Sequence, residues 1–143
     1  MKATLLLADH ADVVNGKLYI NGGGWDWIRP GVPFAIALIV HVTWDQTNMK
    51  HSVVLELLDT DGDPVVAPDG NPVRIPFDPL ELGRPAGVKP GTTLNQPYAV
   101  FFPNLPLQGG TQYVWQLSLD GHADEEWRLT FSTTPAPPEA LAA

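Results

Sequence analysis

The chain has 143 residues, an ordinary length for one domain, and it lacks cysteine, which excludes disulfide bonds and thiolate metal sites. Its 16 acidic and 8 basic residues give a formal net charge of −8. Nucleic acids and anionic membranes attract clustered Lys and Arg, and the sequence has no such cluster, so we expect neither as a partner.

Fifteen prolines and thirteen glycines interrupt every helical pattern before the last few residues. The remaining β-branched and aromatic runs, bounded by turn residues, predict an all-β fold. We expect a two-sheet antiparallel sandwich of the immunoglobulin-like type, formed by residues 1–133 as a single domain. Residues 134–143 form a Pro/Ala-rich C-terminal tail, which we expect to be disordered unless a neighbouring chain holds it.

The first two predicted strands are residues 2–8 and 17–20, and Asn15-Gly16 predicts a hairpin turn between them because both residues tolerate positive φ. The opening apolar run meets Asp9 and His10 too early for a signal peptide or a membrane span. We therefore expect a protein not secreted through a signal peptide, and either cytoplasmic or, if a phage encodes it, virion-associated.

Residues 34–44 form the clearest predicted strand. Apolar side chains occur on both of its alternating faces, which predicts a central position in a sheet. We expect the whole strand to be buried, with one face formed by Phe34, Ile36, Leu38, Val40, Val42 and Trp44.

The middle of the chain is interrupted by prolines and glycines. Residues 52–59 and 63–66 predict a hairpin around Asp61-Gly62, and residues 73–77 predict an irregular edge strand. The loop 81–91 that follows is long, and long loops on a rigid scaffold often carry function.

The last predicted elements are a strand over residues 98–102 and a hairpin of 111–120 with 125–133 across Asp120-Gly121. The segment 107–113 resembles a tyrosine corner, in which the Tyr113 hydroxyl would bond the preceding turn. Inward positions of the hairpin are expected to be Tyr113, Trp115, Leu117, Leu119, Trp127, Leu129 and Phe131.

Two groups of residues are candidate metal ligands. Asp59, Asp61 and Asp63 are closely spaced carboxylates, but they lack the later glutamate of an EF-hand loop, and Pro64 follows them. The four histidines, which lack ligand spacing, are His10, His41, His51 and His122. We interpret the acidic group as a solvated turn and predict no metal site and no cofactor.

Gly22-Gly23-Gly24 lacks the lysine and hydroxyl of a phosphate-binding loop and is interpreted as a bulge or strand end. Trp25 and Trp27, two positions apart in an extended segment, would point the same way, either into the core or toward a partner. The candidate partner-binding residues are Trp25, Trp27, Arg84 and Lys89.

Several segments form a distinctive set. They are Leu5-Leu-Leu-Ala-Asp9, Gly16-Lys-Leu-Tyr-Ile-Asn-Gly-Gly-Gly-Trp25, Leu82-Gly-Arg-Pro85 with Pro90-Gly91, and Tyr113-Val-Trp-Gln-Leu with Asp120-Gly121 and Trp127-Arg-Leu. Together they resemble an uncharacterised family of small bacterial and phage-associated proteins. The resemblance implies one intact domain without a removed leader, and it brings no activity, substrate or cofactor.

Catalytic residues are not indicated, because Ser52, Ser118 and Ser132 lie inside predicted strands and none sits in a nucleophile elbow. We expect a non-catalytic structural or interaction module acting within an assembly, either a homo-oligomer or an accessory protein on a larger particle such as a phage capsid. The tail and the loop 81–91 would contact another subunit or protein, burying at least roughly 1,000 Å². Two alternatives remain open: a carbohydrate- or small-ligand-binding module stacking its ligand on Trp25, Trp27 or Trp44, and a hydrolase with an unrecognised site.

Overall fold

The structure is a computed structural model, and it describes residues 1–135. These residues form nine strands and one 3₁₀ turn. In chain order they are β1 (Lys2–Val14), β2 (Lys17–Gly23), β3 (Trp27–Ile28), β4 (Phe34–Val42), η1 (Trp44–Gln46), β5 (Val53–Leu58), β6 (Arg74–Pro76), β7 (Leu94–Phe102), β8 (Gln112–Leu119) and β9 (His122–Thr133).

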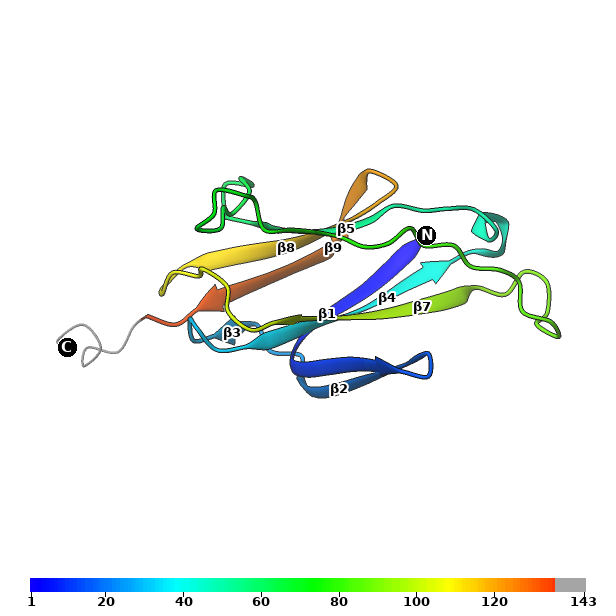
Figure 1. Ribbon diagram of the computed structural model, residues 1–143, viewed down its shortest axis with the longest axis horizontal. Coiled ribbons are helices and arrows are strands. Elements are labelled where there is room, and N and C mark those ends of the chain that lie inside the picture. Colours follow the sequence, from blue (N-terminus) through cyan, green and yellow to red (C-terminus); the bar gives the residue numbers. More distant parts are fainter. Residues whose placement is uncertain (136–143) are drawn as a thin grey trace.

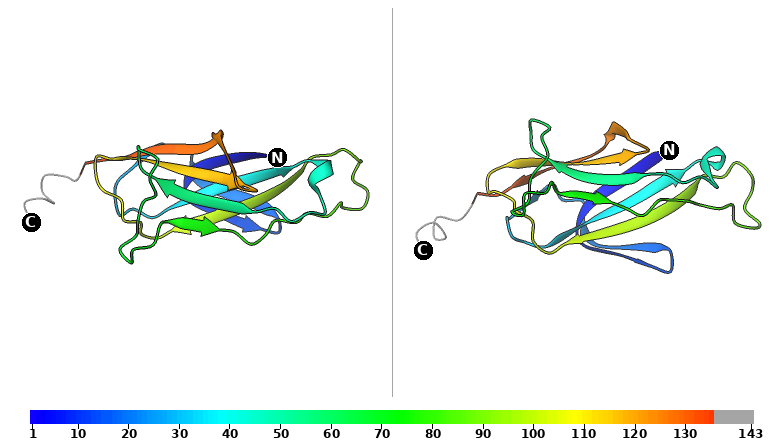
Figure 2. Two further views of the ribbon diagram at one scale, coloured as in Figure 1. Left: turned by 90° about the horizontal axis from the view of Figure 1, so that it is seen from above. Right: turned by 45° about the horizontal axis from the view of Figure 1, so that its top comes forward.

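The strands form two sheets that pack face to face (Figures 1 and 2). One sheet has the order β2-β1-β4-β7, and the other has the order β3-β9-β8-β5-β6. The predicted all-β, two-sheet architecture is therefore confirmed. The expectation that all strands pair antiparallel is wrong at one place, because the short strand β3 runs parallel to β9.

Alternating residues of the central strands fill the space between the sheets. From β4, Phe34, Ile36 and Leu38 are at most 1% exposed, and they meet Trp115 and Leu117 of β8, both 0% exposed. The predicted central position of the strand that begins at Phe34 is confirmed, since β4 lies between β1 and β7. Two positions predicted to be fully inward, Trp127 and Leu129, are only half-buried at the margin of this core.

A second, smaller apolar cluster lies on the opposite face of β4. Ala35 and Ala37 are buried there against Ala11 of β1, with Leu18 of β2 and Ala99 of β7 packed around them. Pairing of β1 with β4 ends at Ala8, after which the β1–β2 hairpin continues on its own and lies beside β7 (Figure 1). Alanine at these positions leaves room for the hairpin to approach the sheet closely.

The first strand is longer than predicted, because it continues through residues 9–14 instead of ending at Ala8. Asn15 and Gly16 form the predicted turn, with φ of 52° and 72°. Gly22 adopts a φ of 63°, a left-handed conformation that favours glycine. A Cβ atom there would lie 2.2 Å from Oδ2 of Asp9, so both the backbone angle and the space favour glycine. The glycine run closes β2 at Gly23, as predicted for a strand end, but the bulge interpretation is wrong, because the β1–β2 register is the same on both sides of Gly22.

Other predicted boundaries also shift. The strand from Phe34 ends at Val42, because Trp44 begins η1 and leaves the inward face. Residues 63–66 make isolated bridges, Leu58 with Pro64 and Val66 with Pro72, and not a strand. Prolines cannot donate to a ladder, which explains why pairing stops there.

The remaining strands follow the predictions with extended ends: β7 begins at Leu94, β9 begins at His122, and the edge strand β6 lies within 73–77. The tyrosine-corner bond is present, since the Gln108 N–H donates to the Tyr113 hydroxyl at 2.9 Å. The Thr134 N–H donates to the Ile28 carbonyl, so the described chain is held to β3 just past β9. The predicted tail lies mostly outside the described residues.

Candidate functional site

The edges of the two sheets differ in how well they are protected against pairing with another chain. In the described part of the chain the outermost strands are β2 and β7 in one sheet, and β3 and β6 in the other. Stretches of two inner strands also have a partner on one side only, since β9 pairs with β3 just at its last two residues and β1 pairs with β4 before Ala8 and with β2 after it. Pro97 removes a donor from β7, and β6 has three residues that end at Pro76. The strand β3 has only two residues. Prolines and short edge strands are devices that discourage unwanted strand pairing.

The edge strand β2 lacks these devices. It has seven residues without proline and without an acidic residue, and Lys17 at its first position is its only charge. Two large apolar side chains are exposed on it, Tyr19 at 55% and Ile20 at 38%. Among the outermost strands of residues 1–135, β2 is therefore the one most open to an extended partner, whereas the free stretch of β9 carries Asp124, Glu125 and Glu126.

The backbone of β2 determines which groups face the open side. Val14 and Lys17 flank the two-residue turn and pair with each other across β1 and β2. Residues that flank such a turn form a hydrogen-bonded pair, and hydrogen-bonded and non-hydrogen-bonded pairs then alternate along the ladder. The N–H and C=O groups of Leu18 and Ile20 consequently point away from β1, toward solvent.

An open groove of about 610 Å³ lies between the β1–β2 hairpin and β7. The hairpin contributes His10 and Val13, and β7 contributes Pro97 and Phe101. Phe101 is 51% exposed, and its ring centroid lies 6.4 Å from that of His10. The groove is therefore lined by polar as well as apolar groups, and it adjoins β1 of the hairpin.

The structure separates the two candidate tryptophans, and the expectation that they point the same way is wrong. Trp25 is half-buried and packs edge-on against Phe34, with ring centroids 5.7 Å apart. Trp27 in β3 is 64% exposed, whereas its neighbour Ile28 enters the core. Trp25 precedes β3 and lies outside the ladder, so the alternation of a strand does not apply between them.

Arg84 is held by the protein's own residues. Its Nε donates to Oγ1 of Thr47 at 2.7 Å and its Nη2 donates to the Trp44 carbonyl at 2.9 Å. The guanidinium carbon also lies 4.6 Å from the centroid of the Trp44 ring. Arg84 therefore anchors the loop 81–91 to η1. Lys89 lies exposed in a turn of the same loop, where its carbonyl accepts a hydrogen bond from Thr92 Oγ1.

A buried histidine and a carboxylate form a hydrogen-bonded pair that also bonds the backbone on both sides. His51 is 4% exposed, and its Nδ1 lies 2.7 Å from Oδ2 of Asp120, while its Nε2 lies 2.7 Å from the Gln46 carbonyl oxygen. Oδ1 of Asp120 accepts the Ser52 N–H. Both ring nitrogens face acceptors, so the doubly protonated imidazolium satisfies the arrangement.

The pKa values of this pair follow from the same contacts. Burial opposes the charge on His51, but hydrogen bonds to the Gln46 carbonyl and to Asp120 outweigh it and raise the pKa of His51. Burial likewise opposes the charge on Asp120, and hydrogen bonds from His51 and the Ser52 N–H outweigh it and lower the pKa of Asp120. With both nitrogens occupied, the imidazole offers no free lone pair to a substrate.

Sequence reasoning missed this pair, although it had placed Asp120 in a turn. The remaining three histidines lie elsewhere: His10 stands beside Phe101, His41 bonds Thr4 and Asn95, and His122 lies at the start of β9. No group of three potential ligands in residues 1–135 includes a histidine.

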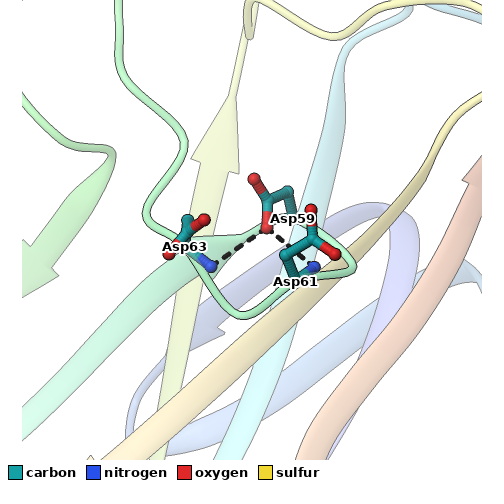
Figure 3. A group of neighbouring side chains, drawn as sticks. All are labelled: Asp59, Asp61 and Asp63. Carbon is teal, nitrogen blue, oxygen red and sulfur yellow. Dashed lines mark hydrogen bonds between the residues drawn. The ribbon is translucent and has the colours of Figure 1, made fainter.

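The carboxylates of Asp59, Asp61 and Asp63 lie close together in the turn after β5 (Figure 3), with ligand atoms within 4.8 Å of one another. Oδ1 of Asp59 accepts the backbone N–H groups of Asp61 and Asp63 at 2.9 and 3.0 Å. This bonding is that of an aspartate turn, which stabilises the loop by itself. The site therefore keeps its interpretation as a solvated acidic turn.

These features define a small two-sheet β-domain that carries an open strand edge and, beside the same hairpin, a groove of mixed polarity. The chain belongs to a family of unknown function, DUF6941, whose match covers residues 3–132. The predicted resemblance to an uncharacterised family is thus confirmed. No curated protein matches the chain. No helix in the part of the chain that the structure describes has the length and hydrophobicity needed to cross a membrane.

Proposed function

We propose that this domain is a non-catalytic interaction module that works within a protein assembly, and that it binds an extended segment of its partner along β2. The observation that carries the proposal is the contrast between edges: β2 is long and free of proline and acidic residues, whereas β3, β6 and β7 are short or contain proline and the free edge of β9 carries three acidic residues. Natural proteins protect their edge strands, so an unprotected edge with exposed apolar side chains is a candidate for pairing.

The groove between the hairpin and β7 supports the same proposal. It adjoins the hairpin that carries β2, and the exposed Phe101 side chain lines it. An added strand would gain backbone hydrogen bonds from Leu18 and Ile20, and side chains of the partner would gain apolar contacts nearby. The assembly would be either a homo-oligomer or a larger particle, such as a phage capsid, to which the domain attaches.

The two alternative functions have less support. For a hydrolase, His51 beside Asp120 would be the first candidate base, but the Nε2 atom of His51 faces the Gln46 carbonyl and is not free to accept a proton. A carbohydrate-binding module would need exposed aromatic platforms, but Trp25 packs against Phe34 and Trp44 lies under Arg84, which leaves Trp27. We therefore place neither ahead of the interaction module.

Site-specific photo-crosslinking tests the proposal. A photoreactive amino acid at position 19 should capture a protein partner in the natural source, because Tyr19 lies on the open edge. The same group in place of Val66, which is also 55% exposed but lies outside β2, should capture little. Adding Ile20→Pro should abolish capture, since it removes an outward N–H. Equal labelling at both positions, or labelling unaffected by Ile20→Pro, would contradict the proposal.

A further inference from the structure

We propose that the partner of β2 is β2 of a second copy of this chain, paired antiparallel about a two-fold axis through Tyr19. This inference rests on the proposed function and specifies which molecule binds along β2. The pairing would join two four-stranded sheets edge to edge into one continuous sheet. It follows from the sequence of β2, from its exposed backbone groups and from the distribution of charge.

The first argument is the register. Centred on Tyr19, an antiparallel pair places Leu18 opposite Ile20 of the second copy, and Ile20 opposite its Leu18. These are the residues whose backbone groups face away from β1, so each such pair can exchange two hydrogen bonds. A register shifted toward Gly22 would meet its φ of 63°, which interrupts the extended backbone.

The second argument is the side chains that this register brings together. The two Tyr19 rings would meet on the axis as a close, non-hydrogen-bonded pair, and two Leu–Ile pairs would flank them. Lys17 would lie opposite Asn21, so no like charges would face each other. Cross-strand aromatic and aliphatic pairs are among the contacts that stabilise a sheet. An isologous interface requires such a self-complementary strand.

The third argument is electrostatic. Two copies that each carry a net charge of −8 repel one another over most of their surface. None of the 16 acidic residues of the chain lies in β2, and its one charge is the positive Lys17. Two copies can therefore approach at this edge with little repulsion. Added salt should strengthen the contact, because it screens the repulsion between the acidic residues elsewhere on the two copies.

The expected dimer is weak. Five paired residues bury less than the roughly 1,200 Å² of a standard stable interface, so we expect a dissociation constant on the order of 100 μM. Sedimentation equilibrium of the full chain from about 10 to about 500 μM should show a reversible monomer–dimer equilibrium. A wild-type chain that stays monomeric over that range would overturn the proposal.

Charge substitution on the axis gives the sharper test. Tyr19→Lys and Tyr19→Glu each place like charges opposite themselves and should weaken dimerisation at least about tenfold. An equimolar mixture of the two variants should dimerise again. The matched control is Trp27→Lys, which makes the same change at an exposed aromatic residue on β3 and should leave association unchanged. Unchanged dimers in the single variants, or a mixture that stays monomeric, would show that the axis does not pass through Tyr19.

Failure of self-pairing is distinguishable from failure of the proposed function. If the chain is monomeric but a photoreactive group at position 19 captures a different protein, and Ile20→Pro abolishes that capture, the partner is not a second copy and the interaction function stands. If neither dimerisation nor specific capture occurs, both proposals are wrong.

Discussion

His51 and Asp120 lie 69 positions apart in the sequence, and their side chains meet at 2.7 Å between Nδ1 and Oδ2. The Ser52 carbonyl also accepts the Asp120 N–H, so the start of β5 is joined to the β8–β9 turn at several points. His51 extends the connection to η1 through the Gln46 carbonyl. This one pair therefore ties together three segments at one end of the sandwich.

The free energy of unfolding of the domain should depend on pH through both His51 and Asp120. The pKa of His51 is raised above 6.5, so its contribution is fully present below that value and is lost as pH rises through the folded-state pKa. The pKa of Asp120 is lowered below 3.8, so its contribution is present above that value and is lost as pH falls through the folded-state pKa. Urea unfolding from pH 3 to 9 should show a plateau between these limits.

The His51→Gln variant should lose the decline on the alkaline side and should be less stable on the plateau. Because the Asp120 side chain is 40% exposed, we expect a loss of about 1–3 kcal/mol, below that of a fully buried pair. The control is His10→Gln, which changes an exposed histidine outside this contact. Identical pH profiles for the wild type and His51→Gln would contradict the assignment of an ionised pair.

Replacement of Gly22 by alanine should destabilise the β1–β2 hairpin. The substitution adds strain at a φ of 63° and a clash with Asp9, so we expect a loss of about 1–3 kcal/mol in chemical unfolding. Gly24→Ala, with φ of 93° but open space around its Cβ, tests strain alone and should cost less. The double variant Gly22→Ala with Asp9→Ala should recover part of the loss. Equal costs for Gly22→Ala and Gly24→Ala would show that the clash is relieved by a small shift.

The loop 81–91 should loosen when Arg84 is removed. Arg84→Ala loses two hydrogen bonds and the contact with the Trp44 ring, so limited proteolysis within the loop should accelerate several-fold. Arg84→Lys keeps the charge but not the planar group that makes both bonds, and should restore little. Lys89→Ala, in the same loop, is the control and should leave the rate unchanged. A full rescue by Arg84→Lys would indicate that charge alone holds the loop.

Calcium should leave the melting temperature unchanged. The three carboxylates after β5 form an aspartate turn, with Asp59 Oδ1 already accepting two backbone N–H groups (Figure 3). Differential scanning calorimetry with EDTA and with millimolar calcium should therefore give the same midpoint within about 1 °C. A rise with calcium that Asp61→Asn removes would identify the turn as a binding site.

Short-range features of this fold follow directly from the sequence. Asn15-Gly16 and Asp120-Gly121 were predicted as turns, and each of these four residues adopts positive φ. The alternation that begins at Phe34 predicts that β4 is buried, as the structure shows. The Tyr113 hydroxyl accepts a hydrogen bond from Gln108, in the turn before β8. Each of these features depends on backbone preferences or on residues close in the chain, so the local sequence determines it.

Other features were decided only when distant segments came together. The local pattern around Trp25 and Trp27 suggested one extended segment, but parallel pairing with β9 begins only at Trp27 and leaves Trp25 against Phe34. The contact of His51 with Asp120 depends on how β5 pairs with β8, and the open edge of β2 depends on the order of strands in the sheet. Strand order and long-range pairing are set by the total packing of both faces, which no window of neighbouring residues contains.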